Sequence, residues 1–359
     1  MISLLLTIKT IDSMRKVCFL MGIAAFALLA PSGVKAGNDK NAETIYSVTD
    51  AASSVPVPPL LLKAMALRIQ DMDDPSAENV ATMIEDEVSA FGLKRVSAGV
   101  DLWIYAKNAE VKTANGETDY VFKSDDAFVL NVIHAESSVV ELKFKNKAWC
   151  DEYKKAFLNM DFISVPYFEG KRNTYMQPGN FNRLIIEDDD VCSVCYQAKY
   201  FVEPVGLSPY DVISAIGEPA GDLLSLAETR GYTMADSNVN EREGNMEGIF
   251  LSKGCKLSKT RKGVLKIVST SKYKDDPYDY VQLTKENDIV KGVFQRAYHG
   301  DPDEFIEALI SQFYIPDEES FMYPVDFNSG YSLSFNGPEG KKADLRYDSS
   351  GFVTLQIDP

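Results

Sequence analysis

The sequence predicts an α+β protein made of two tandem, related modules, and three observations lead to this prediction. First, short runs of alternating apolar and polar residues recur after residue 100, which is typical of half-buried antiparallel strands. Second, a few helix-like segments precede or interrupt these runs, which favours helices packed on one face of a sheet. Third, the order of segments in residues 59–205 returns in residues 206–359, which indicates an internal duplication.

In the first module, a helix pair is expected before a β-meander. Residues 58–72 form one helix candidate with proline at its start, and a second begins at Asp74-Pro75 and continues to Gly92. A third helix is expected over residues 149–160. The expected strands lie at 101–106, 119–123, 127–134, 139–144, 174–176, 183–186 and 191–196.

The second module repeats this order. Ser208-Pro209-Tyr210-Asp211 is a capping-box start, a second helix ends at Gly231, and a third begins at Asp301. The expected strands lie at 248–251, 264–268, 279–283, 289–294, 331–335, 343–347 and 352–357. Residues 184–196 align without gaps to residues 345–357, so the last strand of each module is expected to bury the same alternate positions.

Residues 1–36 are typical of a secretory signal peptide. A basic start precedes an apolar run, and Val34 and Ala36 stand at the −3 and −1 positions of a small-residue cleavage site. Either Met1 or Met14 is the true start. We therefore expect cleavage after Ala36 and a periplasmic or secreted protein.

The chain that remains after cleavage is expected to be compact and strongly acidic. Residues 37–58 are small, polar and proline-containing, and we expect a flexible lead-in there. The formal net charge is −16, and removing residues 1–36, with four basic residues and one acid, leaves −19. Such a charge disfavours nucleic acid and anionic membranes as partners. The 45% content of apolar residues excludes global disorder, and no transmembrane segment is expected in the mature chain.

One stretch carries a family resemblance. V-G-L-S-P-Y-D-V-I-S-A-I-G-E-P, residues 205–219, resembles the G-[ML]-[ST]-x-x-x-V-x-x-x-[LI]-G-x-P signature of BamE/SmpA-like periplasmic domains. A helix pair followed by a β-meander is also similar to the module of the β-lactamase inhibitory protein. Both resemblances imply exported α/β modules that bind other proteins and catalyse nothing. After Pro219 the chain departs from the first pattern, because a second helix stands where a strand is expected, and no functional residue is carried over.

Four cysteines remain after the expected cleavage, and an even number in an exported protein is typical of a disulfide framework. A redox centre or a zinc site stays open as an alternative. The strand alignment places Cys192 toward the core and Cys195 outward, so a bond between them would require distortion. Cys150 lies on a helix stripe that borders the same core. We therefore expect a Cys150–Cys192 disulfide, with Cys195–Cys255 as the second bond.

No catalytic motif is visible. The chain contains no phosphate-binding loop, no H-E-x-x-H and no G-x-S-x-G, and it has two histidines, His134 and His299. The acidic clusters lack calcium-loop spacing and are expected to be solvated turns, so no metal, cofactor or catalytic residue is expected. Carboxylates that pair only in space stay invisible in a sequence. A secreted hydrolase that uses acidic residues in a cleft between the modules is therefore the alternative.

One segment opposes the overall charge. Residues 253–274 contain eight basic residues and no acid, which indicates either the solvated face of a β-hairpin or a docking strip for an acidic partner surface. The residues expected to bind are Lys256, Lys259, Arg261, Lys262 and Lys266. The sequence thus predicts an exported, non-enzymatic binding protein of the bacterial envelope. Its partner is expected to be another protein or an envelope component, contacted through exposed sheet faces and this hairpin.

Overall fold

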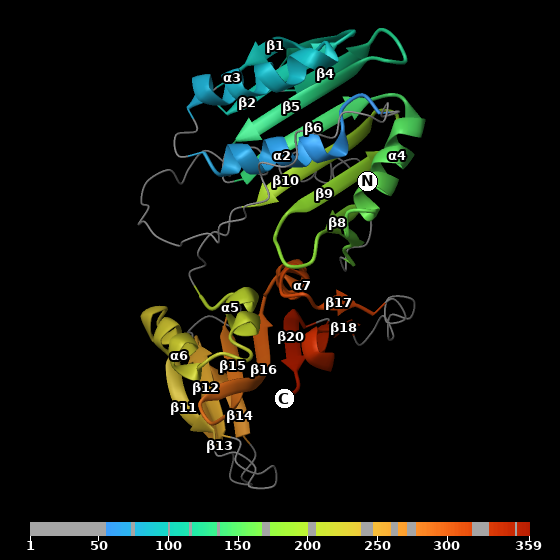
Figure 1. Cartoon of the computed structure of the whole chain (residues 1–359). Helices are drawn as coiled ribbons and strands as arrows, with labels where there is room; N and C mark the ends of the chain where they lie inside the picture. Colours follow the sequence, from blue (N-terminus) through green and yellow to red (C-terminus); the bar gives the residue numbers. More distant parts are fainter. Residues whose placement is uncertain are drawn as a thin grey trace, which may run out of the picture.

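The structure is a computed structural model. It describes residues 55–72, 76–99, 101–114, 117–134, 137–166, 173–199, 206–237, 247–259, 265–270, 278–317, 330–348 and 350–359. The expected signal peptide and nearly all of the lead-in lie outside the described residues. The described chain forms two eight-stranded antiparallel sheets, each packed against its own helices, so the predicted α+β class with two tandem modules is confirmed (Figure 1).

The first sheet has the strand order β1-β2-β5-β6-β10-β9-β8-β7. The bounds of its strands are β1 Lys94–Ala98, β2 Leu102–Lys107, β5 Phe128–His134, β6 Ser137–Phe144, β7 Ile163–Ser164, β8 Thr174–Met176, β9 Arg183–Asp188 and β10 Cys192–Lys199. Strands β3 (Ala109–Ala114) and β4 (Glu117–Phe122) form a separate hairpin. The helices are α2 Pro59–Gln70, α3 Ala77–Val88 with the 3₁₀ turn η3 Ser89–Phe91, and α4 Lys147–Leu158.

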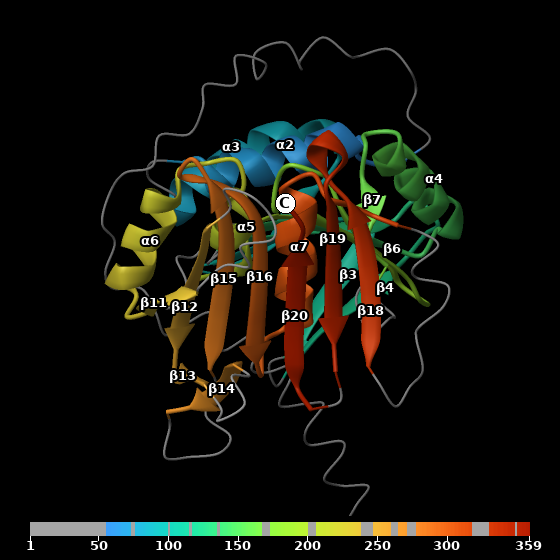
Figure 2. The ribbon, with the colours of Figure 1, turned by 90° about the horizontal axis from the view of Figure 1, so that it is seen from below.

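The second sheet has the equivalent order β11-β12-β15-β16-β20-β19-β18-β17. Its strands are β11 Thr233–Ser237, β12 Glu247–Lys253, β15 Asp279–Glu286, β16 Ile289–Tyr298, β17 Ile315–Pro316, β18 Tyr331–Asn336, β19 Lys342–Tyr347 and β20 Phe352–Ile357. The separate hairpin is β13 (Cys255–Lys259) with β14 (Leu265–Ser269). The helices are α5 Pro209–Ser214, α6 Ala220–Thr229 and α7 Pro302–Ser311, with the 3₁₀ turn η4 Pro338–Gly340. Figure 2 looks onto this sheet, with α7 behind it.

The duplication extends to the pairing of individual residues. Tyr196 of β10 pairs with Val140 of β6, and Ile357 of β20 pairs with Val293 of β16. The ungapped alignment of these last strands is therefore confirmed. Each sheet consists of two four-stranded meanders. In the first sheet these are β1-β2-β5-β6 and β7-β8-β9-β10, and their last strands, β6 and β10, pair at the centre. Each module thus contains two helix-plus-meander units.

Helix starts follow the local signals in the sequence. The Ser208 hydroxyl accepts from the Asp211 N–H while the Asp211 carboxylate accepts from the Ser208 N–H, which makes the capping box that opens α5. Asp301 caps α7 by accepting from the Asp303 N–H. A proline at the first helical position, which is compatible with a helix start, follows each of these caps.

Each module has its own core between helices and sheet. In β10, Cys192, Val194 and Tyr196 are fully buried toward α2 and α4, whereas Cys195 between them is half-buried on the opposite face. This is the predicted alternation. The core of the second module also takes in Val165 and Met176 from the first, so the two modules share an apolar contact.

The structure differs from the sequence prediction in several strands. The strands β1, β3, β7, β11 and β17 are not among the expected strands. The runs 119–123 and 264–268 were expected within the meanders, but they belong to hairpins outside the two large sheets. Alternation of apolar and polar residues identifies a strand, but it does not show which other strand lies beside it, because pairing depends on residues far away in the sequence. No helix among the described segments is long and apolar enough to cross a membrane.

Candidate binding surface on the second sheet

The side of the second sheet that faces away from its helices carries aromatic side chains. Successive side chains of a strand point to opposite faces. Accordingly, Val281 and Leu283 of β15 enter the helix-covered core, while Tyr280 packs with Phe250 in a separate cluster on the other side. We call this second side the helix-free face. Strand β15 therefore contributes aliphatic side chains to the buried core on one face and aromatic side chains to the helix-free face.

At one end of the helix-free face, Tyr278, Tyr298, Phe352 and Arg296 form what we call the aromatic–arginine cluster. The rings of Tyr278 and Tyr298 stack at 5.3 Å, and Phe352 lies 4.9 Å from Tyr298 and 5.7 Å from Tyr278. The guanidinium carbon of Arg296 lies 4.0 Å from the centroid of the Phe352 ring. All four side chains are half-buried, so they are fixed by packing and still reach solvent.

An ion pair fixes the position of the arginine. Asp348 lies 3.5 Å from Arg296, and about a third of each side chain is exposed. Burial opposes ionisation of Asp348, but hydrogen bonds from Ser350 and from backbone N–H groups outweigh it, and the pKa of Asp348 is lowered. The carboxylate is therefore present at neutral pH. The guanidinium lies over the Phe352 ring, and contacts of this kind are attractive.

The aromatic surface continues toward the hairpin β13–β14. Tyr280 stacks on Phe250 at 5.3 Å and lies 5.9 Å from Phe294, and buried Cys255 packs against the same cluster. Burial raises the pKa of both Tyr278 and Tyr280, so their hydroxyls stay protonated and can donate. The cluster is rich in tyrosine and arginine, which are the residue types that contribute most at protein interfaces.

The five basic residues expected to bind fall on or beside this hairpin. Lys256 lies in β13 and is exposed. Lys259 ends β13, and Lys266 lies in β14, where it pairs with Ser258. Arg261 and Lys262 lie outside the described residues. The structure thus places the described part of the basic segment in a hairpin, next along the chain to the strand that carries Phe250.

The two histidines occupy different settings. His134 lies at the end of β5 with its Nδ1 2.9 Å from the Ser138 hydroxyl, and burial lowers its pKa. His299 is exposed, has a positive φ of 58°, and its ring lies 4.0 Å from that of Tyr298. Its N–H donates to the Gly351 carbonyl at 2.8 Å. His299 therefore borders the aromatic–arginine cluster, a position that its sequence context did not predict.

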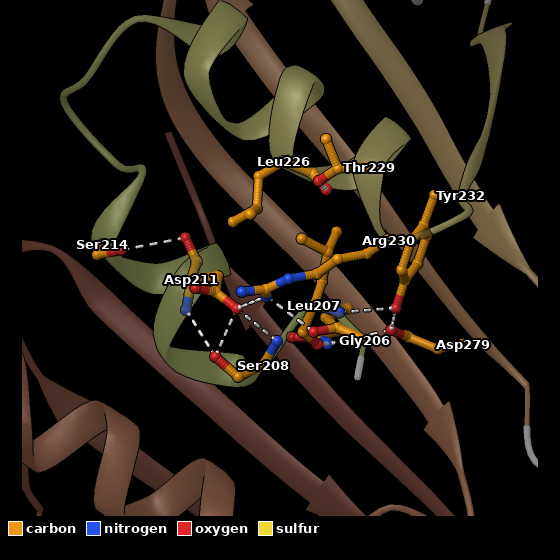
Figure 3. A network of polar contacts seen from close by, with 11 residues as sticks. Gly206, Leu207, Ser208, Asp211, Ser214, Leu226, Thr229, Arg230, Tyr232 and Asp279 are labelled. Carbon is orange, nitrogen blue, oxygen red and sulfur yellow. Dashed lines mark hydrogen bonds and ion pairs between the residues drawn. The ribbon is translucent and has the colours of Figure 1, made fainter. Parts of the chain in front are cut away.

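A buried polar network supports β15 from the helix side (Figure 3). The Tyr232 hydroxyl donates to Asp279 Oδ2 at 2.5 Å and accepts from the Leu207 N–H at 3.2 Å. The Gln295 amide donates to the Leu207 carbonyl at 3.4 Å and to Asp279 Oδ2 at 3.5 Å. Burial raises the pKa of Asp279 to about 6. Because Asp279 lies between Tyr278 and Tyr280, this network fixes the strand from which both tyrosines project.

The first module is apolar at the equivalent positions. Val353 pairs with Ala297 and Ala297 with Asp279, whereas in the first module Cys192 pairs with Phe144 and Phe144 with Phe128. The buried ring of Phe128 thus takes the place of the Asp279 carboxyl. The polar network is therefore a property of the second module, the same module that carries the aromatic–arginine cluster.

The stretch that resembles BamE/SmpA-like domains joins this network. Arg230 Nη1 donates to the Gly206 carbonyl at 2.8 Å and to Asp211 Oδ2 at 2.5 Å, and the Ser208 hydroxyl donates to the same carboxylate at 2.7 Å (Figure 3). These contacts bind the entry of the second module to the end of α6. Glycine, serine and aspartate in this stretch therefore have a structural role in this chain.

An acid at the junction of the modules is held by two cations. Glu307 of α7 has a side chain only 5% exposed, and it accepts from Arg183 at 2.6 Å and from Lys199 at 2.7 Å, both from the first module. A second contact between the modules is the Gly179 N–H, which donates to the Ile310 carbonyl at 3.2 Å. The junction is thus closed by ion pairs and apolar packing.

The structure corrects the cysteine predictions in part. Cys150, Cys192, Cys195 and Cys255 are all free thiols, so neither expected disulfide is present in this structure. Cys195 pairs with Glu141 in the first sheet, whereas Cys255 is buried in the second module. The predicted neighbourhood of Cys150 and Cys192 is present, since their sulfur atoms lie within 4.8 Å of each other.

Sequence reasoning missed the aromatic–arginine cluster because its members come from three separate runs. The only local signal was alternation in β15 and β16, which places every second residue on one face. Comparison with protein-family models and with curated protein sequences finds no match to this chain. The two similar sheets define the chain as an α+β tandem-module protein.

Proposed function

We propose that this chain is an exported, non-enzymatic binding protein of the bacterial envelope, and that it contacts a partner protein through the helix-free face of its second sheet. The aromatic–arginine cluster is the observation that supports this proposal most directly. Its side chains stand on regular strands, are already packed, and present tyrosine, phenylalanine and arginine together. Such pre-ordered side chains lose little conformational freedom on binding.

The charge distribution favours a partner surface with acidic groups beside apolar ones. The chain as a whole is acidic, yet Arg296 lies at the surface of this face, and the hairpin segment 253–274 is basic. Local complementarity of this kind steers association and fixes the orientation of a complex. The aromatic rings would contribute buried apolar area, and the arginine and lysines would select the acidic rim.

Site-specific photo-crosslinking in the native host tests this proposal. A benzoylphenylalanine at Phe352 is expected to give one discrete adduct, which mass spectrometry then identifies. The matched control is the same probe at Leu158, a 44% exposed position on α4 of the first module. We expect no adduct from Leu158, and loss of the Phe352 adduct in the Arg296→Ala background. Equal adducts from both positions, or none from Phe352, would contradict the proposal.

The alternative, a secreted hydrolase with acids between the modules, receives less support. Glu307, the acid at the junction, has a side chain only 5% exposed, and its Oε2 is bound by Arg183 and Lys199, so it is poorly placed to contact a substrate. Burial raises the pKa of neighbouring Glu304, one turn earlier on α7. Hydrolysis of a generic glycoside or ester panel that is lost in Glu304→Gln would favour the alternative.

A further inference from the structure

Two buried thiols lie close together where helix α4 packs on the sheet of the first module. Cys150 lies in the first turns of α4 and is 4% exposed, and Cys192 begins β10 and is 0% exposed. Their sulfur atoms and a carboxylate oxygen of Asp188 all lie within 4.8 Å of one another. The two cysteines are 42 positions apart in sequence, so this proximity is produced by the fold.

The surroundings hold the two elements in place. Lys147, in the same first turn of α4, donates to Asp188 Oδ1 at 2.5 Å and to the Asp189 carbonyl at 2.5 Å. This contact fixes the β9–β10 turn against the start of α4. The Cys192 thiol itself lies 3.6 Å from Asp188 Oδ1 and points its S–H toward that oxygen. The segments that carry the two cysteines, the start of α4 and the start of β10, are therefore held close together by the contacts of Lys147.

The other two cysteines are placed differently. Cys195 is three residues from Cys192 on a regular strand and lies on the opposite face of the sheet, as its pairing with Glu141 and its partial exposure indicate. Cys255 is buried in the second module beside Phe250 and Tyr280. Of the four described cysteines, Cys150 and Cys192 are thus the two with a thiol neighbour at short range.

We propose that Cys150 and Cys192 form one disulfide by exchange with a small disulfide oxidant, while Cys195 and Cys255 stay as thiols. One cysteine thiolate attacks a sulfur of the oxidant, releases one thiol and forms a mixed disulfide. The second cysteine then attacks the protein-bound sulfur and releases the second thiol. The protein loses two thiol protons and two electrons, and the oxidant is reduced from one disulfide to two thiols.

The chemistry of the site sets the conditions for this exchange. Burial raises the pKa of both thiols, that of Cys150 to about 12, so the thiolate fraction is small at neutral pH. The nearby Lys147 ammonium favours the Cys192 thiolate, whereas the Asp188 carboxylate, which accepts from the thiol, raises the pKa of Cys192 further. We therefore expect the exchange to be slow at pH 7 and faster at pH 9, with Cys192 as the first nucleophile. This inference does not depend on the proposed binding surface.

Peptide mapping of the purified full chain decides the question. The reduced protein is incubated with oxidised glutathione, free thiols are alkylated, and the digest is analysed without reduction. We expect a linked Cys150–Cys192 peptide, with Cys195 and Cys255 alkylated. The linked peptide should persist in Cys195→Ser and vanish in Cys150→Ser, where glutathione should instead remain on Cys192.

Two outcomes would overturn the proposal. One is complete alkylation of both Cys150 and Cys192 after long oxidation at pH 9. The other is retention of one Zn²⁺ by the reduced chain in native mass spectrometry, with loss of that zinc in Cys150→Ser. The second result would assign the pair, with Asp188, to a metal site. The mapping uses the wild-type chain, so it stands even where a serine variant fails to fold.

Discussion

Removing the negative charge at Asp279 should stabilise the second module at neutral pH. Asp279→Asn keeps the size and shape of the side chain, and the Asn Oδ1 can still accept from the Tyr232 hydroxyl. The new amide nitrogen replaces Asp279 Oδ1, which has no hydrogen-bond partner among the described residues, so no existing hydrogen bond is lost. The substitution therefore removes the charge with little change in the rest of the network.

The size of the effect follows from the pKa of the carboxyl. Burial raises it from 3.8 to about 6, and each unit corresponds to about 1.4 kcal/mol. A raised pKa means that the native state holds the proton more tightly than the unfolded chain. The stability from this group is thus fully present below about pH 4 and is lost as pH rises through about 6. Because Asp279 retains some exposed area, we expect the loss to be about 1–3 kcal/mol.

Urea unfolding of both proteins between pH 4 and 8 measures this difference. Far-UV circular dichroism follows both sheets, while tryptophan fluorescence follows the first module alone, since Trp103 and Trp149 both lie there. The free energy of unfolding of Asp279→Asn relative to wild type should rise between pH 4 and 6.5 and stay constant above. Asp222→Asn, at an exposed position of α6, is the matched control and should show a constant offset. A pH-independent difference for Asp279→Asn would refute the reasoning.

Two further predictions concern the module junction and the leader. Glu307→Gln removes the negative charge that pairs with Arg183 and Lys199 and should lower the free energy of unfolding by about 2 kcal/mol, measured in urea, because a largely buried ion pair is broken. Its control, Glu218→Gln at an exposed position, should change the value by less than about 0.5 kcal/mol. Expression of the full chain in a Gram-negative host should give a periplasmic protein whose first residue is Gly37. A cytoplasmic product that retains residues 1–36 would contradict the expected signal peptide.

Much of the fold was predictable because local rules and the duplication agree. Ser208 and Asp301 identified helix starts through their capping chemistry, and the alternation in the last strand of each module identified its buried face. The internal duplication provided a second sequence for the same strand, so the buried positions of one copy could be compared with those of the other. It correctly placed Cys192 inside and Cys195 outside.

Other features depended on contacts between distant residues. Strands β4 and β14 were expected within the meanders but belong to separate hairpins, because alternation does not say which strand is the neighbour. The expected Cys195–Cys255 bond is not present in the structure, and the sequence gives no distance between the two modules from which to judge it. Sequence reasoning did not single out Glu307, which is buried between two cations from the other module.

By itself, the sequence determined the α+β class, the tandem modules, the helix starts and the faces of the main strands. All of these depend on residues within a few positions of one another or on comparison of the chain with itself. Only the tertiary structure decided that Tyr278, Tyr298, Phe352 and Arg296 meet and that Asp279 is buried on the other side of the same sheet. The physical reason is that strand pairing and helix packing bring together residues tens of positions apart, and no local pattern records which ones.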